Sequence, residues 1–264
     1  MQSKIHNKKI IVTGASSGIG ERICWHIAKN GGKPIMLARS IDKLTNLQIH
    51  LKKEFGTDSF IYKIDLQKQD EIDSVINHIL LNHKQVHGLI NNAGIGVFDY
   101  ITDMKWNDVS QMFTLNVYAS MKISQLLIPH FSEHHTGHIV NIVSQAAKIS
   151  TPKSAAYGAS KQAILGFTNT MRQEIKRDRI FVTAVNLGPV RTNFFSIADP
   201  GGSYQKNVER YMLDPDMVAK NVVQSLFSNK REINMPFWME IGSIFYRLFP
   251  RLMERLLKSQ FSKK

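Results

Sequence analysis

The stretch KIIVTGASSGIGERI, residues 9–23, decides the fold. It opens with a short apolar run, glycines follow at positions 14, 18 and 20, and a helical pattern extends from Gly18 to Asn30. Glycines in a turn between a strand and a helix let the backbone approach a pyrophosphate closely, and the first N–H groups of the helix face that anion. The spacing G-x-x-x-G-x-G differs from the common G-x-G-x-x-G, so a plain strand-to-helix turn is the alternative interpretation.

The alternation of strand and helix continues along the chain. Apolar runs predict strands at 34–39, 60–65, 88–94, 138–144, 180–188 and 232–236, and amphipathic stretches predict helices at 41–55, 67–84, 105–129, 154–176 and 215–228. Continuously apolar runs separated by crossover helices are typical of parallel strands that are covered on both faces. We therefore expect the α/β class: a doubly wound parallel sheet (Rossmann fold) in one domain, residues 1–236, followed by an amphipathic helical extension, residues 237–264.

Composition and charge restrict the class of protein. Of 264 residues, 43% are hydrophobic and 21% charged, as in ordinary globular proteins. The one cysteine, Cys24, excludes an internal disulfide framework and a cysteine metal cluster. We find no secretory signal and no run of about 18 apolar residues, so we expect a cytoplasmic protein. The net charge of +13 favours anionic partners, but the basic residues are spread without a nucleic-acid-binding signature, so nucleic acid is not expected.

Several motifs occur in a recognisable order. TGASSGIG (13–20), NNAG (91–94), Asn116, Ser144 and YGASK (157–161) together resemble the short-chain dehydrogenase/reductase family, and the match extends from about Lys8 to Pro236. The segment NLGPVRT (186–192) corresponds to the family's Pro-Gly segment, although Leu187 stands where proline is usual. The resemblance implies hydride transfer between a nicotinamide and a carbonyl or alcohol, a homo-oligomer (dimer or tetramer), and no metal.

The stretch SAAYGASKQA, residues 154–163, places a phenol and an ammonium on one helix face. Tyr157 and Lys161 are four residues apart, about one helical turn. A carbonyl that accepts hydride also needs a proton, which Tyr157 can donate, and a nearby cation is expected to lower the tyrosine pKa. Ser144 can orient the substrate oxygen. By resemblance, Lys161 also bonds the nicotinamide ribose, and Asn116 holds a water linked to the lysine.

The residue after the second strand distinguishes the two dinucleotides. A carboxylate there would bond the 2′-hydroxyl of NAD, but this chain has Ala38 followed by Arg39, whose guanidinium suits a 2′-phosphate. We therefore predict NADP(H), with a solvated strand-end arginine as the alternative. By resemblance, Asp65 meets the adenine amino group. The predicted cofactor-binding residues are Gly14, Ser16, Ser17, Gly18, Ile19, Gly20, Arg39, Asp65, Leu66, Asn92, Ala93, Gly94, Tyr157, Lys161, Pro189, Val190 and Thr192.

The loop at 192–213 is the expected substrate loop. Its Phe194, Phe195 and Tyr204, together with Ser144, are predicted to contact an apolar substrate; the alternative is that these aromatic residues only anchor the loop. The histidine-rich stretch HHTGH (134–138) lies at a helix-to-strand turn without an acidic or cysteine partner. We expect a surface loop there and no metal site.

The last residues carry an apolar stripe. Apolar side chains stand at 244, 245, 248, 249, 252, 253, 256 and 257, and Arg247, Arg251, Arg255 and Lys258 stand opposite. Pro250 is expected to kink the helix or to start a new one. The stripe favours packing over the substrate cleft or on a subunit partner. Peripheral contact with an anionic membrane surface and a disordered appendage are the alternatives.

These observations predict an NADPH-dependent reductase of a small-molecule carbonyl whose substrate is apolar and lipid-like. One alternative is a 3-oxoacyl-thioester reductase, because the same residues serve that reaction and a basic surface suits an acidic acyl carrier protein. The other is a non-catalytic NADP(H)-binding sensor.

Overall fold

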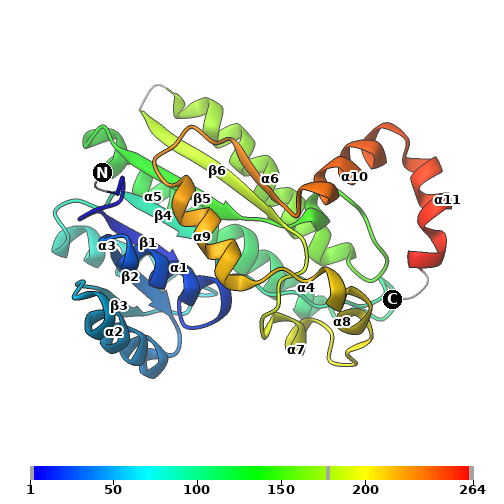
Figure 1. The fold of residues 1–264 in the computed structure, drawn as a ribbon, viewed down its shortest axis with the longest axis horizontal. Helices are drawn as coiled ribbons and strands as arrows, with labels where there is room; N and C mark the ends of the chain where they lie inside the picture. The colour runs from blue at the N-terminus through cyan, green and yellow to red at the C-terminus, as the bar shows by residue number, and fades with distance from the viewer. Residues whose placement is uncertain (1–2, 177–178, 262–264) are drawn as a thin grey trace.

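The computed structural model describes residues 3–176 and 179–261. Seven parallel strands form one sheet in the order β3-β2-β1-β4-β5-β6-β7 (Figure 1). The strands are β1 (Lys9–Thr13), β2 (Lys33–Ala38), β3 (Phe60–Lys63), β4 (Gly88–Asn91), β5 (Gly137–Ile142), β6 (Ile180–Leu187) and β7 (Glu232–Met235). The predicted α/β class with a doubly wound parallel sheet is therefore confirmed.

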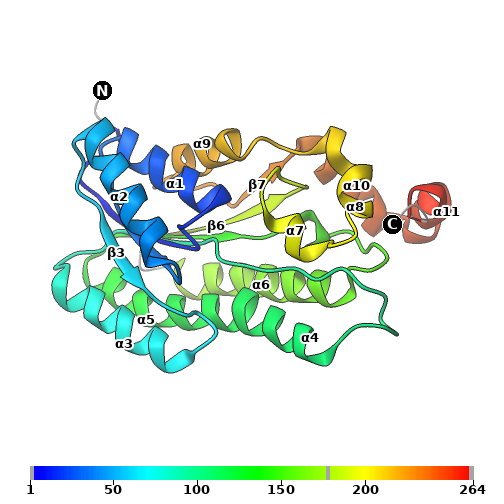
Figure 2. The ribbon, with the colours of Figure 1, turned by 90° about the horizontal axis from the view of Figure 1, so that it is seen from below.

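Helices cover both faces of the sheet, as Figure 2 shows. One layer holds α1 (Gly18–Lys29), α2 (Ile41–Phe55) and α9 (Pro215–Ser225), and the other holds α3 (Gln69–Asn82), α5 (Ala119–Glu133) and α6 (Ala155–Glu174). Along β1, Ile10 and Val12 pack into the first layer and Ile11 into the second, as the alternation of side chains in a strand requires. All three are fully buried, which explains the continuously apolar strand.

The remaining elements gather near one end of the sheet. They are α4 (Trp106–Phe113), the π-helix η1 (Thr114–Tyr118), the 3₁₀-helices η2 (Gln145–Ala147) and η4 (Glu209–Tyr211), α7 (Phe194–Ala198), α8 (Ser203–Val208), α10 (Phe237–Leu248) and α11 (Pro250–Phe261). The strand order reverses between β1 and β4, and the crevice beyond the carboxyl ends of such strands is where doubly wound folds bind ligands.

The expected single helix at 105–129 is wrong in two respects. It consists of α4, a π-helical turn and α5, and α5 continues past Pro129 to Glu133. A proline inside a helix costs one backbone hydrogen bond. Leu127 and Phe131, on either side of the proline, are fully buried against the sheet, and this burial keeps the segment helical.

His138 corrects the expectation of a surface loop at 134–138. His134 and His135 lie in the turn, but His138 belongs to β5 and is fully buried. Its Nδ1 accepts from the N–H of Phe227 at 2.8 Å, and its Nε2 lies 2.9 Å from the hydroxyl of Thr183. Because Nδ1 is an acceptor, the proton resides on Nε2. Burial lowers the pKa of His138 to about 3, so the ring is neutral.

This histidine should make the free energy of unfolding depend on pH. An ordinary histidine has a pKa of about 6.5, so the unfolded chain takes up a proton below that pH while folded His138 does not. Its contribution is complete above pH 6.5 and is lost as the pH falls toward about 3. Through His138, the free energy of unfolding of the wild type should fall by about 2 kcal/mol between pH 7 and pH 5. In His138→Gln this part of the fall should be missing, which urea unfolding at the two pH values measures. The exposed His50→Gln is the control. Equal pH profiles for wild type and His138→Gln would contradict the assignment.

Candidate functional site

The turn between β1 and α1 comes close to neighbouring backbone. Gly14 has a φ of 65°, which favours glycine, and a Cβ on Gly20 would collide with the carbonyl oxygen of Gly14. Gly18, with a φ of 57°, lies against Thr192, where a Cβ would stand 3.3 Å from the threonine Cγ2. The small residues of the motif are therefore required by the shape of the turn. Ser16, Ser17 and Ile19 line the same turn at the start of α1.

A hydrogen-bonded link joins this turn to the end of β4. The hydroxyl oxygen of Thr13 accepts from the N–H groups of Asn92 (2.9 Å) and Ala93 (3.0 Å), and the Asn92 amide donates to the carbonyl of Thr13 at 2.9 Å. Gly94 follows directly. The predicted residues after β1 and β4 are thus brought together, and Thr13 is a positioning residue that the motif analysis did not single out.

The end of β2 carries positive charge. Ala38 is buried, Arg39 is exposed immediately after it, and within the described residues no ion pair involves Arg39. The register partner of Ala38 is Lys63 at the end of β3, which adds a second exposed cation. Asp65 and Leu66 follow in the next turn, where the Asp65 carboxylate accepts from the N–H of Gln67 at 3.1 Å.

Tyr157 and Lys161 lie on the buried face of α6. Their side chains are 9% and 6% exposed, and the Lys161 Nζ stands 5.9 Å from the centre of the tyrosine ring. The ammonium donates to the carbonyl of Ile142 at 3.1 Å, which fixes it beside the end of β5. Gly94 lies close by: a Cβ there would stand 3.1 Å from Asn116 Oδ1, a tight contact, and 3.5 Å from the Lys161 Nζ, an ordinary one.

Ser144 follows β5 and faces the tyrosine. Its hydroxyl is hydrogen-bonded to Tyr157, donates to the carbonyl of Leu187 at 3.3 Å and accepts from the N–H of Ala146 at 3.1 Å. Three contacts from three segments hold the serine in one orientation. The serine and the phenol are therefore presented as a fixed pair.

Burial controls the protonation of the pair on α6. It raises the pKa of Tyr157 to about 12, and the hydrogen bond with Ser144 acts in the opposite direction with a smaller effect. Burial lowers the pKa of Lys161 to about 8. The pKa of Tyr157 thus lies above its ordinary value because of burial, and the lowering expected from Lys161 stays a prediction. At neutral pH the phenol is protonated and can act as a proton donor.

Asn116 lies in the π-helical turn η1, a type of distortion that is frequent at functional sites. Its Oδ1 accepts from the N–H of Ile95 at 2.9 Å, and its Nδ2 donates to the carbonyl of Ile95 at 2.9 Å and to the hydroxyl of Ser160 at 3.0 Å. Ser160 in turn donates to the carbonyl of Tyr157 at 2.8 Å. Asn116 thus contacts the α6 backbone through Ser160, which sequence analysis missed.

Aromatic side chains form a wall around the tyrosine. Phe98, in the loop after β4, lies 5.5 Å from Tyr157, 6.3 Å from Phe194 and 5.0 Å from Tyr204 between ring centres. Phe194 also lies 5.7 Å from Tyr157. Phe195 is buried behind this wall and anchors the loop. Phe194 therefore packs directly against Tyr157, and Tyr204 joins the wall through Phe98, which was not predicted. The predicted contacts of Phe194, Phe195 and Tyr204 with a substrate stay a prediction.

The base of the loop at 192–213 is closed by a short parallel bridge. Val190 pairs with Leu213, whose N–H donates to the carbonyl of Pro189 at 2.9 Å, and the Arg191 N–H donates back to Leu213 at 3.0 Å. Thr192 then lies against Gly18 of the first turn. The bridge places the predicted residues 189–192 beside the glycine-rich turn.

Comparison with known proteins agrees with this geometry. The family described as short chain dehydrogenase matches residues 8–200. The chain belongs to this short-chain dehydrogenase family. It is 26% identical, over 98% of this chain and 97% of the relative, to the uncharacterized oxidoreductase YbbO of Escherichia coli. It is 30% identical, over 83% of this chain and 90% of the relative, to the uncharacterized oxidoreductase SSP1627 of Staphylococcus saprophyticus. It is therefore an oxidoreductase by family.

A solved structure shares the fold. The short-chain dehydrogenase from Sphingobium yanoikuyae in complex with NADPH superposes with a TM-score of 0.80 and 23% identity, covering 92% of this chain and 95% of that chain. At this identity the likeness concerns the fold alone.

In this short-chain dehydrogenase a buried lysine ties the segment after Ser144 to β7 and to α10 (Phe237–Leu248). Lys148, just after η2, donates to Glu232 of β7 at 2.7 Å, to Asn234 at 3.1 Å and to Glu240 of α10 at 2.7 Å. Lys148 is only 7% exposed. Burial tends to raise the Glu232 pKa, but the bonds from Lys148 outweigh it and hold that pKa below its ordinary value. The ammonium thus joins two carboxylates that would otherwise repel each other.

Removing this ammonium should destabilise the protein. We expect Lys148→Met to lower the free energy of unfolding by about 2–3 kcal/mol, because two largely buried carboxylates lose their shared counter-ion. Lys122→Met is the control, since it removes a more exposed pair with Asp73 and should cost less than about 1 kcal/mol. Denaturant titrations of both variants measure the difference. Equal losses would show that the Lys148 cluster does not hold α10 on the sheet.

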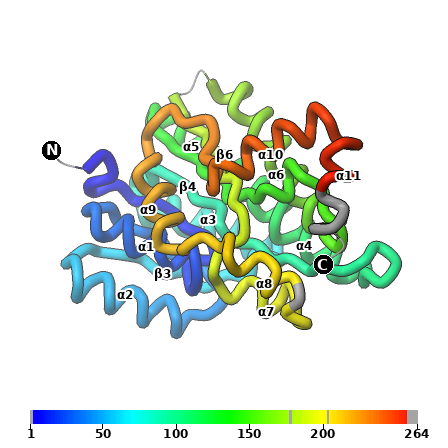
Figure 3. The backbone as a smooth tube through the Cα atoms, turned by 45° about the vertical axis from the view of Figure 1, so that its right-hand side comes forward, coloured from blue at the N-terminus to red at the C-terminus, as the bar shows by residue number. Residues whose placement is uncertain are grey.

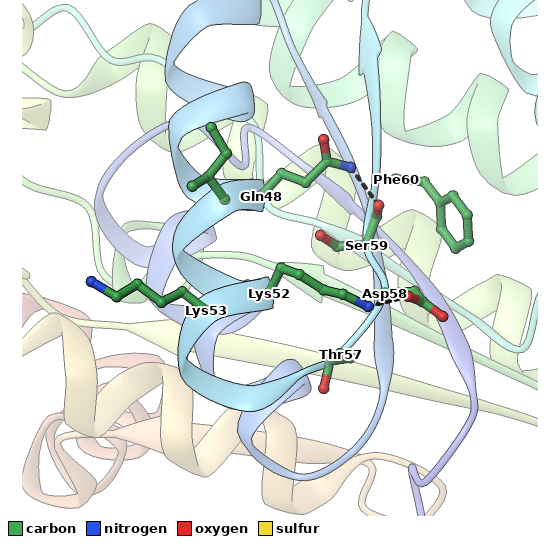
Figure 4. A pocket seen from close by; sticks show the side chains of 8 residues that line it. Gln48, Lys52, Lys53, Thr57, Asp58, Ser59 and Phe60 are labelled. Carbon is green, nitrogen blue, oxygen red and sulfur yellow. Dashed lines mark hydrogen bonds and ion pairs between the residues drawn. The ribbon is translucent and has the colours of Figure 1, made fainter.

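A surface hollow at the edge of the sheet lies apart from this site (Figure 4). Its side chains come from α2, β3 and the segment between them, with an ion pair of 2.9 Å between Lys52 and Asp58. β3 is the edge strand, whereas Tyr157 and Ser144 stand beside β5 and β6. The hollow therefore takes no part in the arrangement around the tyrosine.

Two further features are absent from residues 3–176 and 179–261. No cluster of three or more histidine, cysteine or acidic side chains there could hold a metal ion. None of the helices in these ranges is both long enough and apolar enough to cross a lipid bilayer.

Proposed function

We propose that this chain is an NADPH-dependent carbonyl reductase with an apolar substrate. The observation that carries the proposal is the Tyr157 hydroxyl, which is protonated at neutral pH, hydrogen-bonded to the fixed Ser144 and surrounded by aromatic rings. A protonated phenol in an apolar wall can donate a proton to a substrate oxygen. Such a group is needed for reduction of a carbonyl.

Four residues of the chain would each have a distinct role in proton transfer. A bound NADPH would supply the hydride. Tyr157 would donate its proton to the carbonyl oxygen, and Ser144 would orient that oxygen through its hydroxyl. Lys161, held by Ile142, would stabilise the developing phenolate because its ammonium stands 5.9 Å from the ring. Asn116, beside Gly94, would hold a water in the route that returns a proton to Tyr157.

The glycine-rich turn fits the pyrophosphate of a dinucleotide. Gly14, Gly18 and Gly20 lie at the turn into α1, next to Asn92 and Thr192, where the first N–H groups of the helix can face an anion. The exposed Arg39 and Lys63 support NADPH over NADH, because both flank the end of β2 and neither forms an ion pair among the described residues. In addition, Ala38 places no carboxylate there that would repel a phosphate. The Sphingobium relative was solved with NADPH.

The aromatic wall favours a substrate with an apolar body next to its carbonyl group. Phe98, Phe194 and Tyr204 offer ring faces to such a body. A net charge of +13 keeps a second candidate open, reduction of a 3-oxoacyl thioester on an acidic carrier protein. Cytoplasmic location and a homo-oligomer are further parts of the proposal.

A substrate screen tests the proposal. Purified enzyme is mixed with NADPH and a panel of long-chain aldehydes, ketones and carrier-linked 3-oxoacyl thioesters, and the loss of NADPH absorbance is followed. Turnover of free apolar carbonyls supports the proposal, and turnover confined to carrier-linked substrates favours the thioester reaction. Tight NADPH binding with no turnover of any compound would favour a nucleotide sensor.

A further inference from the structure

The helix α10 turns its polar side toward the protein and its apolar side outward. Glu240 bonds Lys148 at 2.7 Å, Ser243 is 2% exposed, and Tyr246 is half-buried and hydrogen-bonded to Ser150. These residues form the inner face. The expectation that the apolar stripe packs over the cleft is therefore wrong for α10, because the ion pair to Lys148 holds the opposite side of the helix against the body.

An exposed apolar face on α10 and α11 is left outside. Its side chains are 43–71% exposed, the reverse of an ordinary surface helix. They are Phe237, Trp238, Ile241, Ile244, Phe245, Leu248, Phe249, Leu252 and Leu256. α11 begins at Pro250, which is one of the expected outcomes for that proline, and lies beyond α10, away from the sheet (Figures 1 and 3). We call these nine residues the C-terminal apolar face. An exposed apolar patch of this kind usually marks an interaction site.

The charges around this face are positive. Arg247, Arg251 and Arg255 are all exposed beside it. The acidic Glu254 accepts from the Tyr246 hydroxyl at 3.1 Å, and Glu240 is held by Lys148. A second copy of the chain would set arginines against arginines, with a net charge of +13 on each partner. An anionic lipid surface, by contrast, would neutralise the arginines while its acyl region accepts the apolar side chains.

We propose that the C-terminal apolar face docks this protein onto an anionic membrane surface. α10 and α11 are each 12 residues long, which suits helices that lie in the interface. Phenylalanine, tryptophan and leucine opposite arginine are the residue types that such helices use. The docking does not rest on the proposed reaction.

Docking would also orient the protein. Trp238 of α10 lies 5.6 Å, between ring centres, from Tyr211 at the end of the substrate loop, and Tyr246 reaches Ser150 in the segment after Ser144. α8, α10 and α11 lie toward the same end of the molecule in Figure 1. The membrane would therefore meet the protein beside the substrate loop, where an apolar molecule could enter from the lipid.

Vesicle sedimentation tests the docking with the full chain. Vesicles of equal parts phosphatidylglycerol and phosphatidylcholine should pellet the wild-type protein at about 0.05 M salt, and binding should fall steeply toward about 0.5 M. Phe245→Ser/Leu248→Ser should weaken binding at least tenfold. Arg247→Gln/Arg251→Gln/Arg255→Gln should weaken it about a hundredfold. Pure phosphatidylcholine vesicles should bind the wild type as weakly as mixed vesicles bind the arginine variant.

Matched controls distinguish docking through this face from binding that depends only on the overall charge or the total exposed apolar surface of the protein. Ile49→Ser/Leu81→Ser removes exposed apolar side chains from α2 and α3 and should leave vesicle binding unchanged. Lys29→Gln/Lys53→Gln/Lys220→Gln removes the same charge from other exposed helices and should weaken binding less than threefold. The proposal would be overturned if the wild type did not pellet with the mixed vesicles at low salt. It would also be overturned if the control variants lost as much vesicle binding as the test variants. A dimer that Phe245→Ser/Leu248→Ser dissociates, without vesicle binding, would identify the face as a contact between two copies.

Discussion

Replacing Tyr157 by phenylalanine is expected to lower kcat at least a hundredfold while the Kd for NADPH changes less than about threefold. The phenylalanine ring keeps the packing against Phe98 and Phe194, so the wall and the fold stay in place. What is lost is the hydroxyl that Ser144 holds and that burial keeps protonated. Acid catalysis by a positioned side chain is worth about 10² to 10⁴ in rate. Steady-state turnover with NADPH and fluorescence titration of the cofactor measure the two quantities.

A second tyrosine in the same wall provides the control for this variant. Tyr204 is also buried enough that its pKa rises to about 12, and its ring lies 5.0 Å from Phe98. Tyr204→Phe removes a comparable hydroxyl and should lower kcat less than about tenfold. If Tyr157→Phe kept more than about a tenth of the wild-type kcat, Tyr157 would not be the proton donor.

Reversing the charge at position 39 should change the choice of cofactor. We expect Arg39→Asp to raise the Kd for NADPH about a hundredfold and the Kd for NADH less than about threefold. The guanidinium is exposed directly after β2 and pairs with no carboxylate in the described part of the chain, so it is available for a 2′-phosphate. An aspartate there would repel the phosphate and could bond a 2′-hydroxyl instead.

Fluorescence titrations with both dinucleotides measure the change. Lys53→Asp, at an exposed position on α2, makes the same change in net charge and should alter both affinities equally and by less than about threefold. Equal weakening of NADPH and NADH by Arg39→Asp would show that Arg39 does not contact the 2′-phosphate. Retained affinity for NADPH would point to Lys63 as its partner.

Sequence periodicity predicted the fold because the buried strands leave a local signature. Strand β1 appears in the sequence as an apolar run because Ile10, Ile11 and Val12 are all fully buried. The turn after it is rich in glycine because, at position 20, only glycine fits against the Gly14 carbonyl. Tyr157 and Lys161 were predicted because their relation is helical and local. These features depend on neighbours in sequence, which a sequence displays directly.

The missed features depend on contacts between distant segments. Phe98 stands in a loop with no periodicity, and its role appears only when Phe194 and Tyr204 fold back on it. His138 was placed in a surface loop together with His134 and His135, yet it lies in β5, where Thr183 and Phe227 from other elements contact it. The outward apolar face of α10 could not be predicted either, because Lys148 decides which side of the helix faces the sheet.

Transfer of deuterium from the cofactor tests the central claim most directly. Enzyme is incubated with an apolar ketone that the screen identifies and with NADPH carrying deuterium at both C4 positions, and the alcohol is analysed by mass spectrometry. We predict one deuterium on the carbinol carbon with wild-type enzyme and, under the same conditions, at least a hundredfold less labelled alcohol with Tyr157→Phe. Alcohol without deuterium, or equal labelled product from both proteins, would contradict hydride transfer assisted by Tyr157.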